Sequence, residues 1–333
     1  MDDGQLDVDP AAAALLIADQ FPHWAGLDVR RVDSDGTVNL IYRLGETYSL
    51  RFPLNVAESE ELALTLAAEH SAMNAFAGVS TVPSPTPVAV GAPGPGYPQQ
   101  WSVHTWVQGE VATPTAHASS AVLARDVAAL LRALRSTDTQ GATFSGAGRG
   151  GDLRDSDDWM EVCFRESEGL LPVSQLRALW REFRELPPSG PDRMTHGDLT
   201  PANLLVDGER LVGIIDTGGF GPADPALDLV VAWHLFDSPA REVLRDELAI
   251  GEGEAARGGL GVPTVDGAGL VLPRVESGHE RPRAQQSRAD RRGVGPVTVI
   301  RPCGSGRGTR RRHRSLTGRS PLRQGAARSA ARR

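Results

Sequence analysis

The stretch from His196 to Asp216 constrains the fold of this 333-residue chain more than any other part of its sequence. Two short, mostly apolar runs, 203–206 and 211–215, flank a four-residue connection that contains an Asp-Gly pair. Such a connection between two apolar runs is typical of a β-hairpin turn. The sequence therefore predicts two antiparallel strands joined by a tight turn.

The register expected for this hairpin brings polar side chains together at its open end. Counting pairs outward from the turn sets Val206 against Leu211 and Asn203 against Ile214. Asp216 then lies about two residues, roughly 7 Å, beyond the partner of Asn203.

Three oxygen-bearing side chains, those of Asp198, Asn203 and Asp216, are thus expected to converge. Asp198 lies in a loop that Pro201 keeps from becoming helix. Oxygen ligands suit Mg²⁺, which takes one or two protein carboxylates and completes its shell with phosphates and water. A further carboxylate, held off the metal, accepts a proton from a hydroxyl nucleophile, which completes the minimal equipment for phosphoryl transfer. The alternative is a surface hairpin whose polar ends only cap turns.

The complete order of these residues resembles that of a known family. A His-Gly-Asp-Leu run at 196–199 is followed by Asn203, the hairpin, Asp216 and an Asp-Pro-Ala-Leu-Asp-Leu run at 224–229. This order is similar to that of the aminoglycoside phosphotransferase family, with His-Gly-Asp standing where protein kinases carry His-Arg-Asp. The resemblance implies that Asp198 is the catalytic base and that Asn203 and Asp216 bind Mg²⁺, with ATP or GTP as the co-substrate.

The resemblance also implies an α+β class and a two-lobed, protein-kinase-like fold. Residues 1–107 then form a nucleotide-binding lobe, with an antiparallel sheet and a helix. Residues 108–250 form a mainly helical catalytic lobe that carries the hairpin. Residues 251–333 remain as a basic tail.

Residues 29–52 alternate and turn in a way that predicts three antiparallel strands. The turn after the first strand contains Ser34 and Gly36, whose small size allows backbone amides to approach the phosphates of a nucleotide. Because this turn has a single glycine, an ordinary hairpin turn is an equal alternative.

Residues 59–77 predict a long helix that ends at Gly78. Its apolar stripe consists of Leu62, Leu66, Met73 and Phe76. Glu69 falls on the same stripe, where a carboxylate is costly unless it is paired, and Arg51 on the third strand is the expected partner. In the resembled fold this pair corresponds to the strand Lys and helix Glu that orient nucleotide phosphates, although Arg has a different geometry from Lys. The alternative is that both side chains are solvated.

Strands are also expected at 88–90 and 101–107, and the second of them leads into a hinge at 108–110. The resemblance implies that the backbone from Thr105 to Val107 hydrogen-bonds the purine. Trp106 has core packing as its alternative role. In the catalytic lobe, residues 121–134 predict a strongly amphipathic helix.

Three further residues are expected to support the catalytic loop. His196 is a general base in one interpretation, and in the favoured one it braces the loop through hydrogen bonds. Asp224 is expected to cap a helix that begins at Pro225, and Asp228 follows in the first turns of that helix.

Composition excludes several other classes of protein. The two cysteines, Cys163 and Cys303, are far apart and lack metal-ligand spacing, so neither a disulfide framework nor a zinc site is expected. The acidic start and the short apolar run at 11–18 favour a soluble helix over a secretory signal or a membrane span. We therefore expect a cytoplasmic protein with no membrane partner.

The composition changes sharply near residue 250. Residues 1–250 hold 17 arginines against 36 acidic residues, whereas residues 251–333 hold 18 against 6 and contain no aromatic residue. Such a segment is expected to be disordered, and a basic tail suggests nucleic acid as a partner. The favoured interpretation is a GC-rich gene read out of frame. The helices that complete the acceptor site in the resembled family are then missing.

These features predict a phosphotransferase that acts on a hydroxyl group of a small molecule. An aminoglycoside-type antibiotic is the leading acceptor, and a macrolide or a metabolite alcohol is an alternative. From a different class, the alternative is a catalytically impaired nucleotide-binding remnant whose tail binds nucleic acid.

Overall fold

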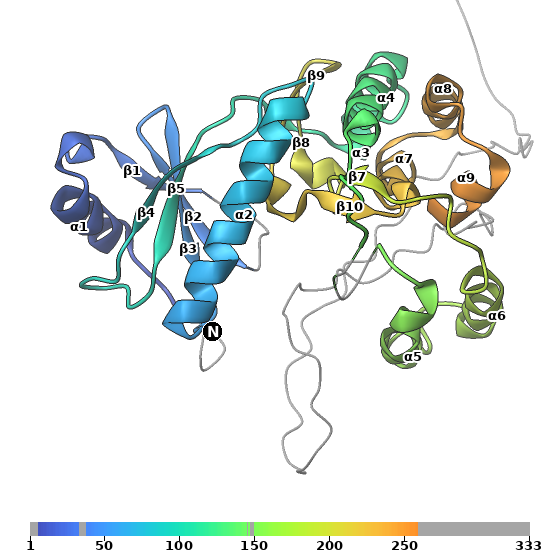
Figure 1. The fold of residues 1–333 in the computed structure, drawn as a ribbon, viewed down its shortest axis with the longest axis horizontal. Helices are drawn as coiled ribbons and strands as arrows, with labels where there is room; N and C mark the ends of the chain where they lie inside the picture. Colours follow the sequence, from blue (N-terminus) through green and yellow to red (C-terminus); the bar gives the residue numbers. More distant parts are fainter. Residues whose placement is uncertain (1–5, 33–37, 145, 147–149, 259–333) are drawn as a thin grey trace, which may run out of the picture. The chain divides into compact units, whose positions relative to one another are not determined.

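The computed structural model describes residues 6–32, 38–144, 146 and 150–258 (Figure 1). Within them an antiparallel sheet with one long helix is followed by a mainly helical part that carries a β-hairpin. The predicted α+β, two-lobed architecture is therefore confirmed.

The N-terminal lobe is built on a five-stranded antiparallel sheet with the strand order β1-β2-β3-β5-β4. Its strands are β1 (Val29–Arg31), β2 (Asn39–Leu44), β3 (Tyr48–Pro53), β4 (Pro87–Gly91) and β5 (Trp101–Thr105). Because side chains alternate along a strand, one face collects the core residues Tyr42, Leu50, Phe52 and Val103, all fully buried. The opposite face is left for Arg51 and its neighbours.

The apolar face of this sheet packs against α1 (Pro10–Gln20), which is followed by the short helix η1 (Pro22–Trp24). Asp9 begins α1 as expected, because its carboxylate accepts a hydrogen bond from the Ala12 amide at 2.7 Å and Pro10 occupies the first turn. Leu16 and Ile17 of α1 are buried in the same core as the strands.

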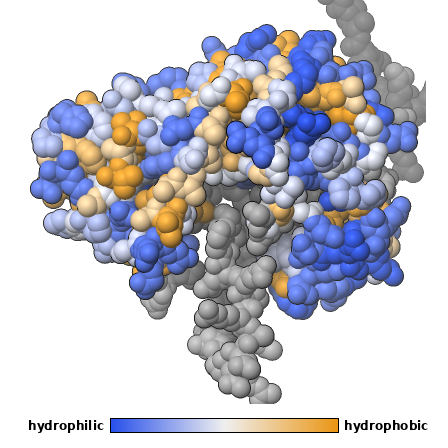
Figure 2. Space-filling model, viewed as in Figure 1, coloured by the Kyte–Doolittle hydropathy of each residue, from blue (hydrophilic) through white to orange (hydrophobic). Residues whose placement is uncertain are grey.

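Helix α2 (Ser59–Val79) buries its predicted apolar stripe. The stripe residues, all at most 7% exposed, are Leu62, Leu66, Met73 and Phe76. The predicted end at Gly78 is wrong, since the Ser80 amide still bonds to the Phe76 carbonyl and the chain becomes extended only at Ser80. Figure 2 shows a band of apolar residues along the outer face of α2, where Leu64 is 67% exposed.

The core of the catalytic lobe includes helix α4 (Ala121–Ser136), whose predicted apolar face is completely buried. Three short strands form a second sheet in the order β6-β8-β9, and β7 pairs with β10. The strands are β6 (Glu110–Val111), β7 (Arg193–Thr195), β8 (Leu204–Asp207), β9 (Arg210–Ile214) and β10 (Gly221–Ala223). The remaining α-helices are α3 (Pro114–His117), α5 (Asp157–Glu166), α6 (Val173–Phe183), α7 (Val230–Leu235), α8 (Ser238–Leu248) and α9 (Glu252–Gly258). The short 3₁₀ helices are η2 (Leu153–Ser156), η3 (Pro201–Asn203), η4 (Thr217–Gly219) and η5 (Pro225–Leu229).

Helix α9 corrects the predicted boundary at residue 250. Residues 252–258 were expected to belong to a tail without packed structure, yet they form a helix that packs on η5. Arg257 of this helix is only 7% exposed and makes an ion pair with Asp224. The packed lobe therefore extends at least to Gly258. The rest of the tail, with its predicted disorder, frame shift and nucleic-acid binding, lies outside the described residues.

A membrane-spanning helix needs a long and strongly apolar segment. No helix in the described part of the chain meets both requirements.

Candidate active site

The hairpin at the centre of the site has a register that differs by one residue from the expected one. Val206 pairs with Leu211 as predicted, but Leu204 pairs with Ile214, because a β-bulge leaves Val212 as an extra residue on β9. The Ile215 amide donates to the Asn203 carbonyl at 3.0 Å. The predicted pair of Asn203 with Ile214 is therefore wrong. Asp216 lies one residue, not two, beyond the residue that faces Asn203.

The hairpin packs directly against the hinge between the lobes. A Cβ atom added at Gly213 of β9 would lie 2.5 Å from Cγ1 of Val107 and 3.3 Å from a methyl group of Leu205. Only a glycine fits at this approach. The hinge backbone is thus held against the strand that leads to Asp216.

The loop that carries Asp198 closes on itself. The backbone carbonyl of Asp198 accepts hydrogen bonds from the Thr200 amide at 2.9 Å and from Nδ2 of Asn203 at 2.8 Å. Pro201 begins the short helix η3, which contains Asn203. Because the amide nitrogen of Asn203 faces the Asp198 carbonyl, its Oδ1 points away from that carbonyl and is the atom left for a cation.

His196 connects the catalytic loop with the end of the hairpin. Its Nδ1 accepts a hydrogen bond from the Asp198 amide at 3.2 Å, and its Nε2 lies 3.0 Å from the Ile215 carbonyl. An acceptor at Nδ1 places the proton on Nε2, which donates to that carbonyl. Both ring nitrogens are therefore engaged. This is the geometry expected of a bracing residue, and it leaves the ring no nitrogen for a general base.

Asp228 binds the backbone of the same loop through two hydrogen bonds. Its carboxylate, 2% exposed, accepts from the amides of His196 at 2.8 Å and Gly197 at 3.0 Å. Burial raises the pKa of the Asp228 carboxyl above its ordinary value, and the two loop amides act against this rise. Gly197 has φ +89°, a left-handed conformation that favours glycine at this turn. Asp228 thus fixes the backbone directly before Asp198.

The Asp224 carboxylate binds the start of η5 and two segments outside the catalytic loop. It caps η5 through the Ala226 amide at 2.9 Å and accepts from the Ser189 amide at 3.1 Å. It also pairs with Nε of Arg257 at 2.6 Å, and both side chains are less than 8% exposed. The predicted capping role is present, whereas any support for the loop reaches it only through η5.

Asp216 occupies a strained position and has a partner that the sequence did not predict. Its backbone is left-handed, with φ 61° and ψ 48°, which is uncommon for a residue other than glycine and is concentrated at functional sites. Its Oδ1 lies 3.6 Å from Nη2 of Arg51. The side chain of Asp216 is 54% exposed and that of Arg51 is 20% exposed.

The predicted ion pair of Arg51 with Glu69 is wrong, since among the described residues Arg51 pairs with Asp216 instead. The stem of Glu69 packs against η4, where a Cβ added at Gly218 would lie 3.3 Å from Cγ of Glu69. Burial raises the pKa of the Glu69 carboxyl, the Arg51 charge lowers it, and Asp216 raises it further. Glu69 is therefore close enough to feel Arg51 without forming the pair.

Two histidines beside Arg51 were missed by the sequence analysis. His104 of β5, 1% exposed, has its Nε2 3.3 Å from Nε2 of His70 on α2. Burial is the main cause that lowers the pKa of His104 to about 3, and the charge of Arg51 and the neighbouring His70 add to it. The available signal was the strand register, which places Ser102 opposite Arg51 and His104 two residues further along the same face.

The backbone amides of Thr105, Trp106 and Val107 differ in whether another described residue accepts a hydrogen bond from them. The Thr105 amide donates to the Thr86 carbonyl at 2.9 Å, so it is not available to a purine as predicted. The Trp106 amide donates to Thr47 at 2.6 Å, and its ring is half-exposed beneath the Arg43 guanidinium, 4.9 Å away. For Val107, no backbone hydrogen bond to another described residue is present. Its predicted role with a purine stays a prediction.

The donor set at the hairpin end fits Mg²⁺. Asn203 Oδ1 and the carboxylate of Asp216 are hard oxygen atoms on adjoining backbone positions. The described residues contain no group of three or more His, Cys, Asp or Glu side chains placed to hold a metal. A cation bound here would therefore complete its shell with phosphate oxygens and water, which is the usual habit of Mg²⁺.

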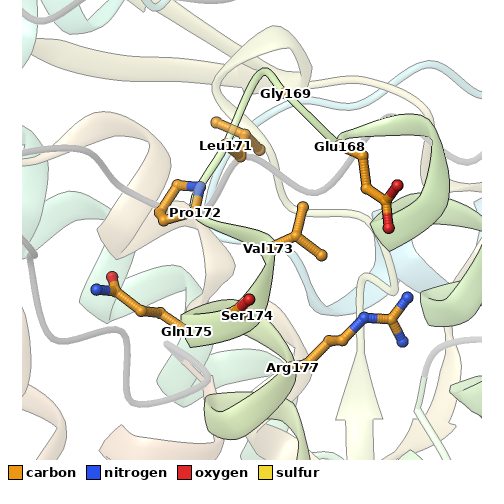
Figure 3. A pocket seen from close by; sticks show the side chains of 8 residues that line it. All are labelled: Glu168, Gly169, Leu171, Pro172, Val173, Ser174, Gln175 and Arg177. Atoms are coloured by element: carbon orange, nitrogen blue, oxygen red, sulfur yellow. The ribbon is translucent and has the colours of Figure 1, made fainter.

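Two predicted residues are not described, and one pocket lies apart from this site. Ser34 and Gly36 are outside the described residues. A surface pocket of about 510 Å³ opens where α5 joins α6 and is lined only by residues within 168–177. Figure 3 shows the side chains of Glu168 and Arg177 on one side of it. None of the predicted site residues lines this pocket.

A sheet lobe hinged to a helical lobe, in which a loop and a hairpin gather Asp198, Asn203 and Asp216, is the arrangement of the kinase-like phosphotransferases. A model of the phosphotransferase enzyme family matches residues 29–262. The chain therefore belongs to this family. The match ends beyond residue 250, in agreement with the packed helix α9.

Solved structures show the same fold. The GDP complex of an aminoglycoside 2'-phosphotransferase-IIIa mutant superposes with a TM-score of 0.60 and 19% identity, over 76% of this chain and 86% of that chain. The macrolide 2'-phosphotransferase from Brachybacterium faecium gives a TM-score of 0.52 and 20% identity, over 73% and 82%.

Sequence similarity to individual relatives is shorter. The aminoglycoside 3'-phosphotransferase of Escherichia coli is 42% identical over 64 residues, which are 19% of this chain and 22% of the relative. A protein of the same description from Salmonella typhimurium gives the same values. The chain therefore matches about a fifth of the length of these relatives.

Proposed function

We propose that this protein transfers the terminal phosphoryl group of ATP or GTP to a hydroxyl group of a small molecule, with an aminoglycoside as the leading acceptor. The observation that carries the proposal is the double hydrogen bonding of His196. One ring fixes the backbone of Asp198 and the residue before Asp216, so the base and a metal ligand are set by the same side chain.

Asp198 is assigned to the acceptor. Its carboxylate orients the hydroxyl group and takes its proton as the oxygen attacks the terminal phosphorus and the bond from that phosphorus to the leaving nucleoside diphosphate breaks. The loop needs no rearrangement for this role, because Asn203, Thr200 and His196 already hold its backbone. Positioning of this kind supplies a large part of the catalysis in phosphoryl transfer.

Arg51, Asn203 and Asp216 are assigned to the phosphates. Asn203 Oδ1 and Asp216 would hold Mg²⁺, which neutralises phosphate charge when it is bound. Arg51 lies beside Asp216, where its planar guanidinium is suited to bind phosphate oxygens. The Val107 amide, which has no backbone hydrogen bond to another described residue, is assigned to the purine; Val107 lies against β9, the strand that ends two residues before Asp216.

The names of the relatives support these choices of donor and acceptor. Similar structures are described as a complex with GDP and kanamycin and as a ternary complex with streptomycin and ATP. The relatives matched in sequence are described as aminoglycoside 3'-phosphotransferases. A macrolide is the alternative acceptor, supported by the Brachybacterium faecium structure.

The test is a transfer assay with the full-length protein. Purified protein is incubated with Mg²⁺ and either ATP or GTP, together with kanamycin, gentamicin, streptomycin or a macrolide. We expect one acceptor to gain the mass of a phosphate group, and Asp198→Asn to abolish this gain without changing the unfolding temperature. A folded protein that binds nucleotide but phosphorylates no hydroxyl acceptor with either donor would contradict the proposal.

A further inference from the structure

Helix α9 brings a buried arginine to the support of the catalytic loop. Arg257 uses every nitrogen of its guanidinium group. Nε pairs with Asp224 at 2.6 Å, Nη1 donates to the Leu186 carbonyl at 2.8 Å, and Nη2 donates to the Gly151 carbonyl at 2.9 Å. One side chain thus joins α9, η5 and two loop segments in the interior. The ion pair is buried, because the side chains of Arg257 and Asp224 are both less than 8% exposed.

The contact continues from Asp224 to the catalytic loop through a single short helix. Asp224 caps η5, and Asp228 lies four residues later in the same helix. Asp228 in turn accepts from the amides of His196 and Gly197. Arg257 is therefore connected to the backbone that precedes Asp198 through the carboxylates of Asp224 and Asp228, which lie at the two ends of η5.

A second set of contacts, made by Glu254, also connects α9 with η5. Glu254 pairs with Arg135 at 2.9 Å, and Arg135 donates to the Pro225 carbonyl at 2.7 Å. Packing is close as well, because a Cβ added at Gly258 would lie 2.6 Å from the Cβ of Leu229. Helix α9 therefore fixes η5 at its first residues and at its last.

We propose that Arg257 is a positioning residue for the catalytic loop and acts through Asp224 and Asp228. A buried ion pair contributes little net stability compared with apolar packing of the same volume, whereas it fixes its partners in one geometry. Here the fixed geometry is that of η5, and with it the two amides that set the backbone of Asp198. The consequence for turnover rests on the proposed function, but the consequence for the order of the loop does not.

The test measures amide hydrogen exchange in the full-length protein. In Arg257→Gln, exchange in residues 194–200 should be about tenfold faster or more, because the loop opens without its support. The control is Leu244→Ala, a buried residue of α8 that belongs to the same lobe. At conditions matched for the loss in unfolding temperature, Leu244→Ala should leave exchange in residues 194–200 close to that of the wild type. Equal exchange in the two variants would overturn the proposal.

A second variant covers the case in which Arg257→Gln does not fold. The double variant Arg257→Met with Asp224→Asn removes both charges, so that no unpaired charge is left buried, and asparagine retains an oxygen for the Ala226 amide. Faster exchange in residues 194–200 supports the proposal, and exchange as slow as in the wild type overturns it. Where the wild type turns over, Arg257→Gln should also lower kcat with little change in the KM for nucleotide. A wild type without turnover removes only the proposed function, since the exchange result still decides.

Discussion

The catalytic loop and the side of the sheet lobe that carries Arg51 are built in opposite ways. In the loop, backbone amides make many of the contacts: Gly197 donates to the Asp228 carboxylate, Asp198 donates to the His196 ring, and Thr200 donates to the Asp198 carbonyl. Beside the sheet, Arg51 meets Asp216 through a long side-chain contact of 3.6 Å, and Asp216 remains half-exposed. Loop geometry is therefore fixed before a ligand binds, whereas the charged groups opposite it are arranged to take a ligand.

The largest effect is expected in the preorganised region. Asp198→Asn removes the proposed base but keeps the backbone and its hydrogen bonds, so kcat should fall about 10²- to 10⁴-fold with the fold unchanged. Steady-state kinetics with the responsive acceptor and circular dichroism check this. Asp207→Asn, an exposed carboxylate at the turn of the same hairpin, should retain full activity. Comparable losses of kcat in both variants would contradict the assignment of Asp198 as the base.

The sheet side should respond to pH in a way that the loop does not. The pKa of His104 is about 3 in the folded protein and 6.5 ordinarily, owing mainly to burial, then to Arg51 and His70. Between these values the unfolded chain binds the extra proton, so the free energy of unfolding falls as the pH drops from 6.5 towards 3. The slope due to this group is about 1.4 kcal/mol per pH unit within the window.

Denaturant unfolding of the wild type and of His104→Phe at several pH values checks this slope. Phenylalanine retains a ring of similar size without a titrating group, so its stability should depend less on pH. His23→Gln, at an exposed position on η1, provides the control and should behave like the wild type. If His104→Phe loses stability on acidification as steeply as the wild type, then His104 is not the group responsible.

Arg51 and Glu69 allow the sheet side to be dissected further. Arg51→Met should lower kcat/KM for nucleotide about 10- to 100-fold, as expected from the loss of hydrogen bonds to charged groups. Glu69→Gln should change it less than about threefold, because the described Glu69 makes no ion pair with Arg51. Arg31→Met, on the exposed strand β1, is the control. Similar losses for Arg51→Met and Glu69→Gln would show that the two residues act as a pair once nucleotide binds.

The same contrast explains what could be predicted from the sequence. Contacts within the 196–228 segment depend on short spacings, so the hairpin, the bracing geometry of His196 and the cap at Asp224 were all expected. Arg51 has its partner 165 residues away, and spacing alone does not choose between Glu69 and Asp216. The bulge at Val212 was not predicted, because one extra residue within an apolar run does not change the hydrophobic pattern of the sequence. Arg257 was missed because its neighbours in the sequence are mostly glycine, alanine and glutamate, and its partner is known only from the fold.

The smallest effect is expected where the hairpin touches the hinge. Gly213→Ala places a methyl group 2.5 Å from Cγ1 of Val107, so the Val107 side chain or one of the two backbones must move, at a cost of about 1–3 kcal/mol in the free energy of unfolding. Because the Val107 amide is the proposed purine contact, the KM for nucleotide should rise as well. Gly208→Ala is the matched control on the same hairpin: its φ of +56° disfavours alanine, but a Cβ there meets no atom within 4 Å. It should lower stability and leave the KM unchanged. If the KM for nucleotide rises equally in both variants, the contact between Gly213 and Val107 is not what couples the hairpin to nucleotide binding.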